Sequence, residues 1–398
     1  MDDISSSPAS LALLPSEDAP GTRELLDLGF QLGQEAGALG GTLQPPVRAA
    51  VGDLVRSMNC YYSNLIEGHD TLPRDIDRAL RSDYETDPRR RDLQLEARAH
   101  IEVQAMVDRG DLDGLGVGAD LVVALHREFC TRLPDALLWV ESRDRQRRLH
   151  VEPGRWREVE VDVGRHVPVA PDMIPAFMEH FGHGYALERV GRARGAIAAA
   201  ASHHRLLWIH PFLDGNGRVA RLYSHAYLRL LGIGSDLWSV SRGLARTVAR
   251  YMAALERADF PPQTMTDGRG TLSERELGEF CRYFLEIALD QVRFMRGLLD
   301  PVQLVNRLQT FVIVEAQRKA LDQKVFAVLA RIATAGELPK SDLPAVLGVT
   351  ARHALRLVQP LIDRGLLVSQ GKFAPYRLAF PLTEVEMIFP RLFAPTDG

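Results

Sequence analysis

The twelve residues HPFLDGNGRVAR, at positions 210–221, place several chemically active side chains around a glycine-rich turn. An ordinary histidine has a pKa of ~6.5, so His210 can take a proton from a hydroxyl group at neutral pH. Asp214 offers the hard carboxylate oxygens that Mg²⁺ prefers beside phosphates. Arg218 and Arg221 are three positions apart, so their guanidinium groups lie on one side of a helical turn and suit a polyphosphate.

The two glycines of this stretch, Gly215 and Gly217, allow the backbone to wrap closely where the next helix is predicted to start. The first turn of a helix has unpaired N–H groups and a dipole that favours anions. A base, a metal carboxylate and an anion site together predict phosphoryl or nucleotidyl transfer. Two other loop types are excluded: Phe212 stands where an EF-hand needs an oxygen ligand, and no Gly-Lys-Ser/Thr follows as in a P-loop.

The composition is that of an ordinary globular chain. It has 398 residues, 46% of them hydrophobic and 25% charged, which is enough for two or three domains. The formal net charge of -4 provides no overall positive field for nucleic acid. The three cysteines form no CxxC pair and predict buried free thiols in a cytoplasmic protein. Without a basic signal-peptide segment or an uninterrupted apolar stretch of about 20 residues, we expect no membrane span.

The elements predicted around the turn are mainly helical. Residues 1–20 are rich in Ser, Pro and Asp and predict a disordered tail. Apolar side chains recur at helical spacing over 47–62, and Gly68 is expected to end that helix. Further helices are predicted directly before His210 and directly after the turn. Over 159–169, valines alternate with polar residues about a glycine, which predicts a short β-hairpin.

The stretch at 210–221 resembles the signature of the Fic family, H-P-F-x-[D/E]-G-N-G-R-x-x-R, at every defined position. The resemblance extends over roughly residues 50–300 and implies a Fic-type helical bundle in which the hairpin is a flap. Most Fic enzymes transfer AMP from ATP to a target protein. The resemblance therefore implies a protein adenylyltransferase with ATP as co-substrate, Mg²⁺ as cofactor and a Ser, Thr or Tyr hydroxyl as acceptor.

The resemblance also implies a role for each residue of the stretch. His210 would deprotonate the target hydroxyl, Phe212 would anchor the loop in the core, and Asp214 would hold Mg²⁺. The flap, residues 161–169, would hold a target segment by strand pairing. The nucleotide phosphates would be bound by Gly215, Asn216, Gly217, Arg218 and Arg221.

A second motif, SNLIEG at 63–68, resembles the inhibitory motif of one Fic subclass, [S/T]-x-x-x-E-[G/N]. The resemblance implies that Ser63, Glu67 and Gly68 belong to an inhibitory helix before the core. Glu67 would then enter the active site and pair with Arg221, the guanidinium that the γ-phosphate of ATP needs. Taken alone, the same pattern equally describes a capped helix with a solvent-facing glutamate.

The C-terminal pattern over 322–380 is helix, turn, short helix, second helix and a pair of short strands, which predicts a winged helix-turn-helix. Arg352 and Arg356 of the second helix would face phosphates or base edges if the unit bound DNA. Pro360 would kink that helix, and the unit has few lysines. Recruitment of a protein partner is therefore the preferred interpretation, and DNA binding stays open.

The sequence thus predicts a mainly α protein in four parts. They are a disordered tail (1–20), an N-terminal helical segment with the inhibitory helix (21–110), a Fic core (111–315) and a winged helix-turn-helix domain (316–398). The preferred function is AMP transfer to a protein, with Glu67 as inhibitor. The alternatives are a DNA-binding transcriptional regulator with a nucleotide-sensing Fic domain, and a Fic enzyme that uses another nucleotide donor or reverses AMPylation. The target protein and the oligomeric state, a homodimer included, stay open.

Overall fold

A computed structural model of the protein describes residues 7–41, 43–142 and 146–393, so residues 1–6 of the expected tail and 394–398 of the expected C-terminal domain lie outside it. The prediction of a mainly helical protein is confirmed. The helices are α1 (Thr22–Gly40), α2 (Pro45–Ile66), α3 (Pro73–Leu80), α4 (Pro88–Arg109), α5 (Ala119–Cys130), α6 (Ile174–Tyr185), α7 (Leu187–Ile209), α8 (Asn216–Leu230), α9 (Ser241–Arg246), α10 (Val248–Ala258), α11 (Glu274–Leu298), α12 (Pro301–Gln317), α13 (Val325–Ala335), α14 (Leu343–Leu347), α15 (Ala351–Asp363) and α16 (Val385–Ile388). The strands are β1 (Trp139–Glu141), β2 (Arg148–His150), β3 (Leu367–Val368) and β4 (Arg377–Leu378).

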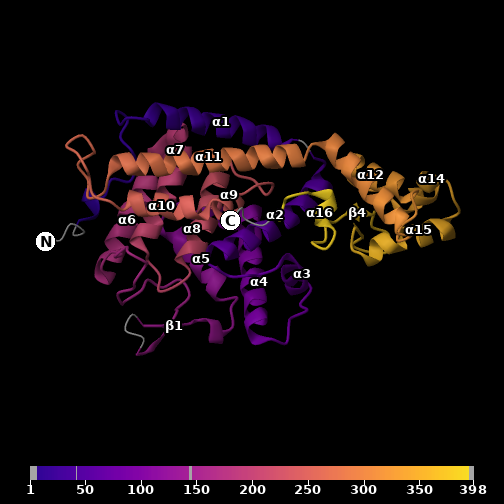
Figure 1. Ribbon diagram of the computed structural model, residues 1–398, viewed down its shortest axis with the longest axis horizontal. Coiled ribbons are helices and arrows are strands. Elements are labelled where there is room, and N and C mark those ends of the chain that lie inside the picture. The colour runs from indigo at the N-terminus through magenta and orange to yellow at the C-terminus, as the bar shows by residue number, and fades with distance from the viewer. Residues whose placement is uncertain (1–6, 42, 143–145, 394–398) are drawn as a thin grey trace.

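The molecule is elongated, with a large helical body that continues into a smaller unit built from α12 to α15 (Figure 1). Helices α1 and α11 lie side by side along one edge of the body. Helix α7 packs against α1, α6, α8 and α11, and nearly every residue from Gly195 to Ile209 is buried. A helix enclosed on all sides needs small and apolar residues around its whole circumference, which the alanine run at 196–201 provides.

Helix α2 lies against α3, α4 and α9 and is buried along most of its length. It ends at Ile66, and Gly68 just beyond it has φ 77°, the left-handed conformation that glycine adopts at little cost. The predicted helix and its predicted end are therefore both present. The chain from Glu67 to Leu72 that follows is neither helix nor strand.

The β-hairpin predicted over 159–169 is reduced to a single bridge, between Val163 and His166 on either side of a left-handed Gly164. The Arg157 guanidinium donates to the carbonyls of residues 159 and 169, so a side chain outside the stretch joins its two ends. Regular antiparallel pairing occurs instead between β1 and β2.

Residues 7–20 pack on the body and do not form the expected disordered tail. The side chains of Leu11 and Leu13 are 2% and 9% exposed. The Leu13 carbonyl accepts a hydrogen bond from Tyr185 Oη at 2.6 Å, and the carbonyl before it accepts one from Arg205 Nε at 2.9 Å. The polar composition of the segment concealed two leucines and the carbonyls that satisfy buried donors, which together hold it in place.

The C-terminal unit consists of α13, α14, α15 and the β3–β4 pair, and one further bridge joins Leu338 to Tyr376. The chain then returns through α16 to the helical body, where it meets α2 (Figure 1). Tyr62 Oη of α2 donates to the Leu392 carbonyl at 3.1 Å, and the Tyr61 ring lies 5.5 Å from that of Phe393. The end of the described chain therefore contacts the last turns of α2.

Two expectations from composition concern single features. The three cysteines are buried, free thiols. Within the described ranges, each helix is too short or too polar to cross a lipid bilayer.

The packing of residues 7–20 can be tested with Leu13→Ala. Removing a buried leucine side chain should lower the free energy of unfolding by about 2 kcal/mol, seen as a lower midpoint in thermal denaturation. Phe30→Ala is the matched control, because the Phe30 side chain is 70% exposed and its removal should leave the midpoint unchanged. An equal midpoint in Leu13→Ala would mean that this segment is a loose tail.

Candidate active site

The loop between α7 and α8 is closed by its own groups. Asn216 Oδ1 accepts from the Phe212 N–H at 2.9 Å, and Asn216 Nδ2 donates to the Phe212 carbonyl at 2.8 Å. The buried Phe212 ring stacks on His126, with centroids 3.8 Å apart and planes 4° apart. Phe212 therefore lies in the core, whereas the Asn216 side chain is used within the loop and leaves only its backbone N–H at the open end of α8.

Two glycines shape the N-terminus of α8. Gly215 has φ 78°, a conformation that side chains with a Cβ rarely adopt. A Cβ on Gly217 would clash with Glu67 Oε1, so this glycine lets a carboxylate approach the first turn of α8. The first N–H groups of a helix have no intrahelical partners, so the positive end of the helix dipole faces this approach.

His210 is the residue at which α7 stops, with a left-handed backbone at φ 51°. Its carbonyl accepts from Arg157 Nε at 2.8 Å, and its partly buried ring lines a cavity beside the loop. Burial, helped by the nearby charges of Arg157 and His166, lowers the pKa of His210 to about 4. The imidazole is therefore neutral at physiological pH and has a lone pair that can accept a proton.

Arg221 is buried and held by the last turn of α2 and the residue that follows that helix. Its Nε donates to Ser63 Oγ at 2.8 Å, and its Nη2 contacts the Ser63 carbonyl at 3.3 Å and forms an ion pair with Glu67 Oε1. Burial opposes ionisation of Glu67, but the charges of Arg221 and Arg218 outweigh it and hold the pKa of Glu67 below its ordinary value. We call residues 63–69 the arm.

Arg218 meets a different carboxylate. Its Nη2 donates to Glu96 Oε2 of α4 at 2.8 Å and lies 3.0 Å from His69 Nδ1, at the end of the arm. The Phe129 ring centroid lies 5.5 Å from the centre of the Arg218 guanidinium. Both loop arginines are thus paired with acidic residues that come from the N-terminal helices.

Asp214 stands apart from these pairs. It is exposed, and its Oδ1 accepts from the Gly215 N–H at 2.7 Å. Among the described residues, no group of three or more His, Cys, Asp or Glu is arranged to hold a metal ion. A single exposed carboxylate next to an anion site still matches Mg²⁺, which commonly takes one or two carboxylates and completes its shell with phosphates and water.

A cavity of 550 Å³ opens beside the loop. It is walled by the arm, the turn at 163–166, the end of α7 and one face of α10. His166 of the turn is fixed by a 2.6 Å contact from its Nε2 to the Trp208 carbonyl. The residues that line the cavity are Ile66, Glu67, Val163, Gly164, Arg165, His166, His204, Leu207, Trp208, His210, Gly217, Arg221, Tyr251, Met252, Leu255, Glu256 and Asp259.

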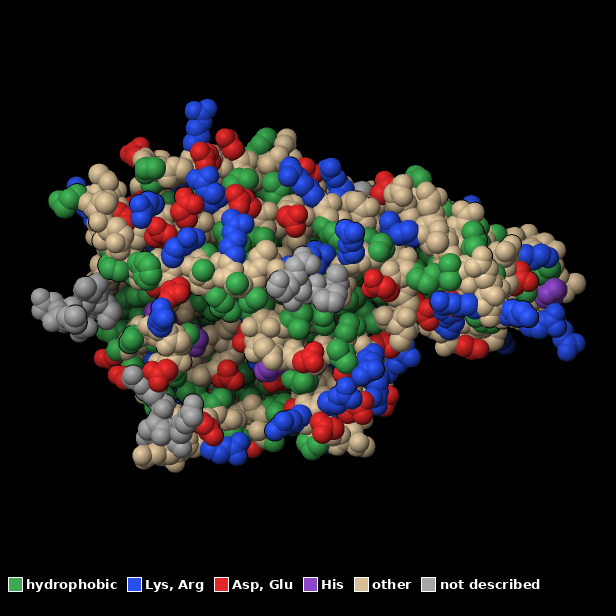
Figure 2. All heavy atoms as spheres, in the orientation of Figure 1, with side chains coloured by type: hydrophobic (Ala, Val, Ile, Leu, Met, Phe, Trp, Pro, Cys, Tyr) green, Lys and Arg blue, Asp and Glu red, His purple; other side chains and the backbone are tan. Residues whose placement is uncertain are grey.

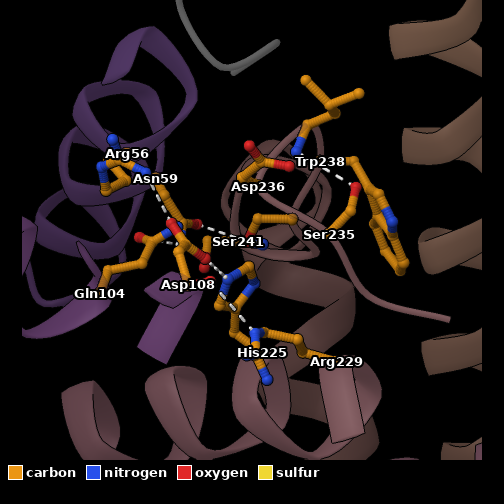
Figure 3. A network of polar contacts seen from close by, with 12 residues as sticks. Arg56, Asn59, Gln104, Asp108, His225, Arg229, Ser235, Asp236, Trp238 and Ser241 are labelled. Atoms are coloured by element: carbon orange, nitrogen blue, oxygen red, sulfur yellow. Dashed lines mark hydrogen bonds and ion pairs between the residues drawn. The ribbon is translucent and has the colours of Figure 1, made fainter. Parts of the chain in front are cut away.

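Buried polar contacts tie α2 to α4 and α8 (Figure 3). Asp108 of α4 accepts from Arg56 Nη1 of α2 at 2.8 Å and lies 2.7 Å from His225 Nε2 of α8. Burial opposes ionisation of Asp108, but His225 and Arg56 outweigh it and lower its pKa. Asn59 of α2 also donates to Gln104 of α4 at 2.7 Å. Because buried polar groups need their partners, this network fixes the position of α2, and with it the arm, against α8.

Of the site residues that the sequence singled out, Glu67, His210, Gly217 and Arg221 line the cavity, whereas Asp214 and Arg218 lie outside its lining. Sequence reasoning missed Glu96, His69 and the α10 wall of the cavity. One signal for Glu96 was available: positions 96, 99, 100 and 103 lie on one face of α4, and the other three are buried, so a carboxylate there interrupts an otherwise buried stripe. The α10 wall has no comparable signal, because apolar residues at helical spacing usually indicate core packing.

Comparison with known proteins gives matches to the loop and to the fold. Residues 117–228, which include the loop, match the family model described as Fic/DOC family. The fold resembles that of a Fic family protein from Desulfovibrio desulfuricans G20, with a TM-score of 0.52 and 20% identity over 92% of this chain and 98% of that one. A Fic domain containing signaling protein from Bacteroides thetaiotaomicron VPI-5482 gives 0.51 and 20%, over 68% and 95% of the two chains. At such identity these structures establish the fold alone.

More particular relatives are the proteins named protein adenylyltransferase Fic. The one from Drosophila grimshawi is 31% identical over 143 residues, which cover 34% of this chain and 30% of that protein. The one from Nematostella vectensis is 29% identical over 174 residues, which cover 43% and 37%. The chain therefore spans about a third of the length of these curated relatives.

The lowered pKa of His210 can be measured by NMR on protein labelled at the histidine Cε1 carbon. The His210 signal should titrate with a midpoint of about 4, because burial disfavours the imidazolium. His150 serves as an internal control, since its contacts with Glu152 and Asp135 raise its pKa above the ordinary value. A His210 midpoint at or above that of a free histidine would contradict the assignment.

Proposed function

We propose that the protein is a Fic-type adenylyltransferase that transfers AMP from ATP to a hydroxyl side chain of a target protein. The observation that carries the proposal is that His210, Gly217 and Arg221 line a 550 Å³ cavity at the N-terminus of α8, the helix that also carries Arg218. A cavity of that volume is in the range of nucleotide and small-molecule sites. The similarity to proteins named protein adenylyltransferase supports the same assignment.

In this reaction His210 takes the proton of the target hydroxyl while that oxygen attacks the α-phosphorus of ATP. A new P–O bond forms, the bond from the α-phosphorus to the bridging oxygen breaks, and pyrophosphate leaves with the electron pair. Arg218, Arg221 and the first N–H groups of α8 counter the charge on the departing phosphates. The low pKa of His210 keeps its imidazole in the proton-accepting form.

Asp214 is the residue that we assign to Mg²⁺. Its carboxylate is exposed at the mouth of the anion site, which leaves room for phosphate and water ligands. Bound there, the metal would neutralise phosphate charge.

We further propose that the arm keeps the enzyme inactive. Ser63 and Glu67 occupy Nε and Nη2 of Arg221, the donors that a γ-phosphate would otherwise use. The ionised Glu67 also places a negative charge where the triphosphate must lie. Because Glu67 and Gly68 lie beyond the last helical residue of α2, the carboxylate can be displaced without unfolding that helix.

For the C-terminal unit we propose a winged helix-turn-helix that recruits a protein partner. The order α13, α14, α15, β3 and β4 is that of such a domain. Basic side chains gather at its free end in Figure 2, and Arg352 and Arg356 are exposed. Leu355 and Phe373 are also 51% and 91% exposed, and large exposed apolar side chains favour a protein surface over DNA phosphates.

The inhibitory role of Glu67 can be tested with Glu67→Gly. Freeing Arg221 should raise self-labelling from ATP about tenfold or more, since a restraint of about 1.4 kcal/mol already corresponds to a factor of ten. The measurement is incorporation of label from α-labelled ATP, with Mg²⁺ present. Equal labelling of the wild type and the variant would remove the inhibitory role.

His210→Ala in the Glu67→Gly background is the control for the chemistry. It should abolish transfer while leaving ATP binding largely intact, because the imidazole acts on the acceptor hydroxyl and not on the nucleotide phosphates. Undiminished labelling would mean that another base acts. If the protein is labelled by another nucleoside triphosphate and not by ATP, the nucleotide donor differs from the proposed one, but the reaction is still nucleotidyl transfer.

The role of the C-terminal unit can be tested with random duplex DNA. We expect the protein not to bind this DNA at physiological salt, as measured by fluorescence anisotropy of the labelled DNA, because apolar side chains are exposed among the arginines of this surface. Salt-dependent retention that is lost in Arg352→Ala/Arg356→Ala would show that the unit binds DNA. Binding to DNA, together with no labelled protein in the ATP transfer assay, would favour the alternative of a DNA-binding regulator with a nucleotide-sensing domain.

A further inference from the structure

A second buried ion pair lies beside the arm. Arg218 and Glu96 have side chains that are 8% and 15% exposed and are joined at 2.8 Å. Removing two charged groups from water costs free energy, and only a close contact between them offsets that cost. Burial opposes ionisation of Glu96, but the hydrogen bond with His69 and the charge of Arg218 outweigh it and hold the pKa of Glu96 below its ordinary value. Glu96 is thus a fixed anion at neutral pH.

The two carboxylates at the site are carried by different kinds of structure. Glu67 lies just past the end of α2, next to a left-handed Gly68 and a stretch without regular structure. Glu96 lies inside the 22-residue helix α4, which packs against α2, α3, α5 and α8. A small change in the turn can move Glu67, whereas Glu96 can move only with the framework.

The two guanidinium groups are also engaged differently. Ser63 and Glu67 take both Nε and Nη2 of Arg221. On Arg218, the contacts with Glu96 and His69 both involve Nη2. Its Nε is buried and has no hydrogen-bond acceptor among the described residues. A buried donor without an acceptor is costly, so an anionic oxygen that reached it would be favoured.

We propose that Glu96 is a positioning residue for the phosphate site: it holds Arg218 by Nη2 and leaves Nε for a phosphate oxygen. Glu67 and Glu96 therefore have opposite effects on nucleotide binding, one displaceable and inhibitory, the other fixed and supportive. The Phe129 ring restrains the guanidinium from a second side. When the residues beyond α2, 67–69, are displaced, the contact of His69 with Arg218 is lost, and Glu96 and the Phe129 ring keep Arg218 in place. This inference rests on the proposed function.

The test compares Glu67→Gly with Glu67→Gly/Glu96→Gln. The double variant should bind α,β-methylene-ATP with Mg²⁺ about tenfold more weakly, because the charge-assisted hydrogen bond that orients Arg218 is lost. Isothermal titration calorimetry measures the dissociation constant. In the transfer assay, KM for ATP should rise by the same factor, with kcat within about twofold, because Glu96 acts on binding and not on the proton transfer.

Two further variants make the result specific. Glu102 lies on the same helix and pairs with Arg98 and Arg132 at the surface. The variant Glu102→Gln should therefore leave the affinity for the nucleotide unchanged. Glu96→Asp retains the charge and should recover part of the affinity lost in Glu96→Gln. Thermal denaturation shows whether Glu96→Gln folds poorly. In that case the affinity of Glu96→Asp serves as the test.

The outcomes separate this inference from the function on which it rests. Equal or tighter nucleotide binding in the double variant would overturn it, because removal of a merely repulsive carboxylate strengthens anion binding. Failure of Glu96→Asp to bind better than Glu96→Gln would also overturn it. Absence of nucleotide binding in Glu67→Gly itself would overturn the proposed function, and this inference with it.

Discussion

Two buried guanidinium groups at the N-terminus of one helix are the constraint on which the rest of this structure depends. Arg218 and Arg221 bring positive charge to the end of α8 that is already the positive end of its dipole. Such an arrangement is stable only if anions lie within contact distance. In this structure Glu67 and Glu96 supply them: Glu96 lies on α4, which packs against α8, and Glu67 lies just past the end of α2.

The proposed function adds a second requirement: if phosphate replaces Glu67, the loop before α8 must keep its shape when the charges change. Phe212 in the core and the reciprocal Phe212–Asn216 hydrogen bonds provide that rigidity without using any charged group. Burial is the main reason that the pKa of His210 is low, and the charge of Glu67 opposes this lowering only in part.

The arm is short, yet its position is set by much of the molecule. The Arg56–Asp108–His225 network holds α2 to α4 and α8, and the Leu392 carbonyl at the end of the described chain meets Tyr62 near the last turn of α2. These contacts fix the position of α2, whereas a small change in the backbone just beyond it would be enough to move Glu67. Because α2 is held in this way, Glu67 and Arg221, which are 154 positions apart in the sequence, form an ion pair.

The sequence by itself determined the mainly helical architecture, the turn between two helices that follows His210 and the end of α2, because each depends on local spacing, turn residues and short-range periodicity. Tertiary structure alone decided the rest. The polar segment at 7–20 packs because buried donors elsewhere need its carbonyls. The predicted hairpin at 159–169 is a single bridge whose two ends are joined by Arg157, a side chain outside the stretch. Glu96 acquires its partner only when α4 meets α8, since a carboxylate that interrupts the buried stripe of α4 does not indicate which cation on a distant helix will pair with it.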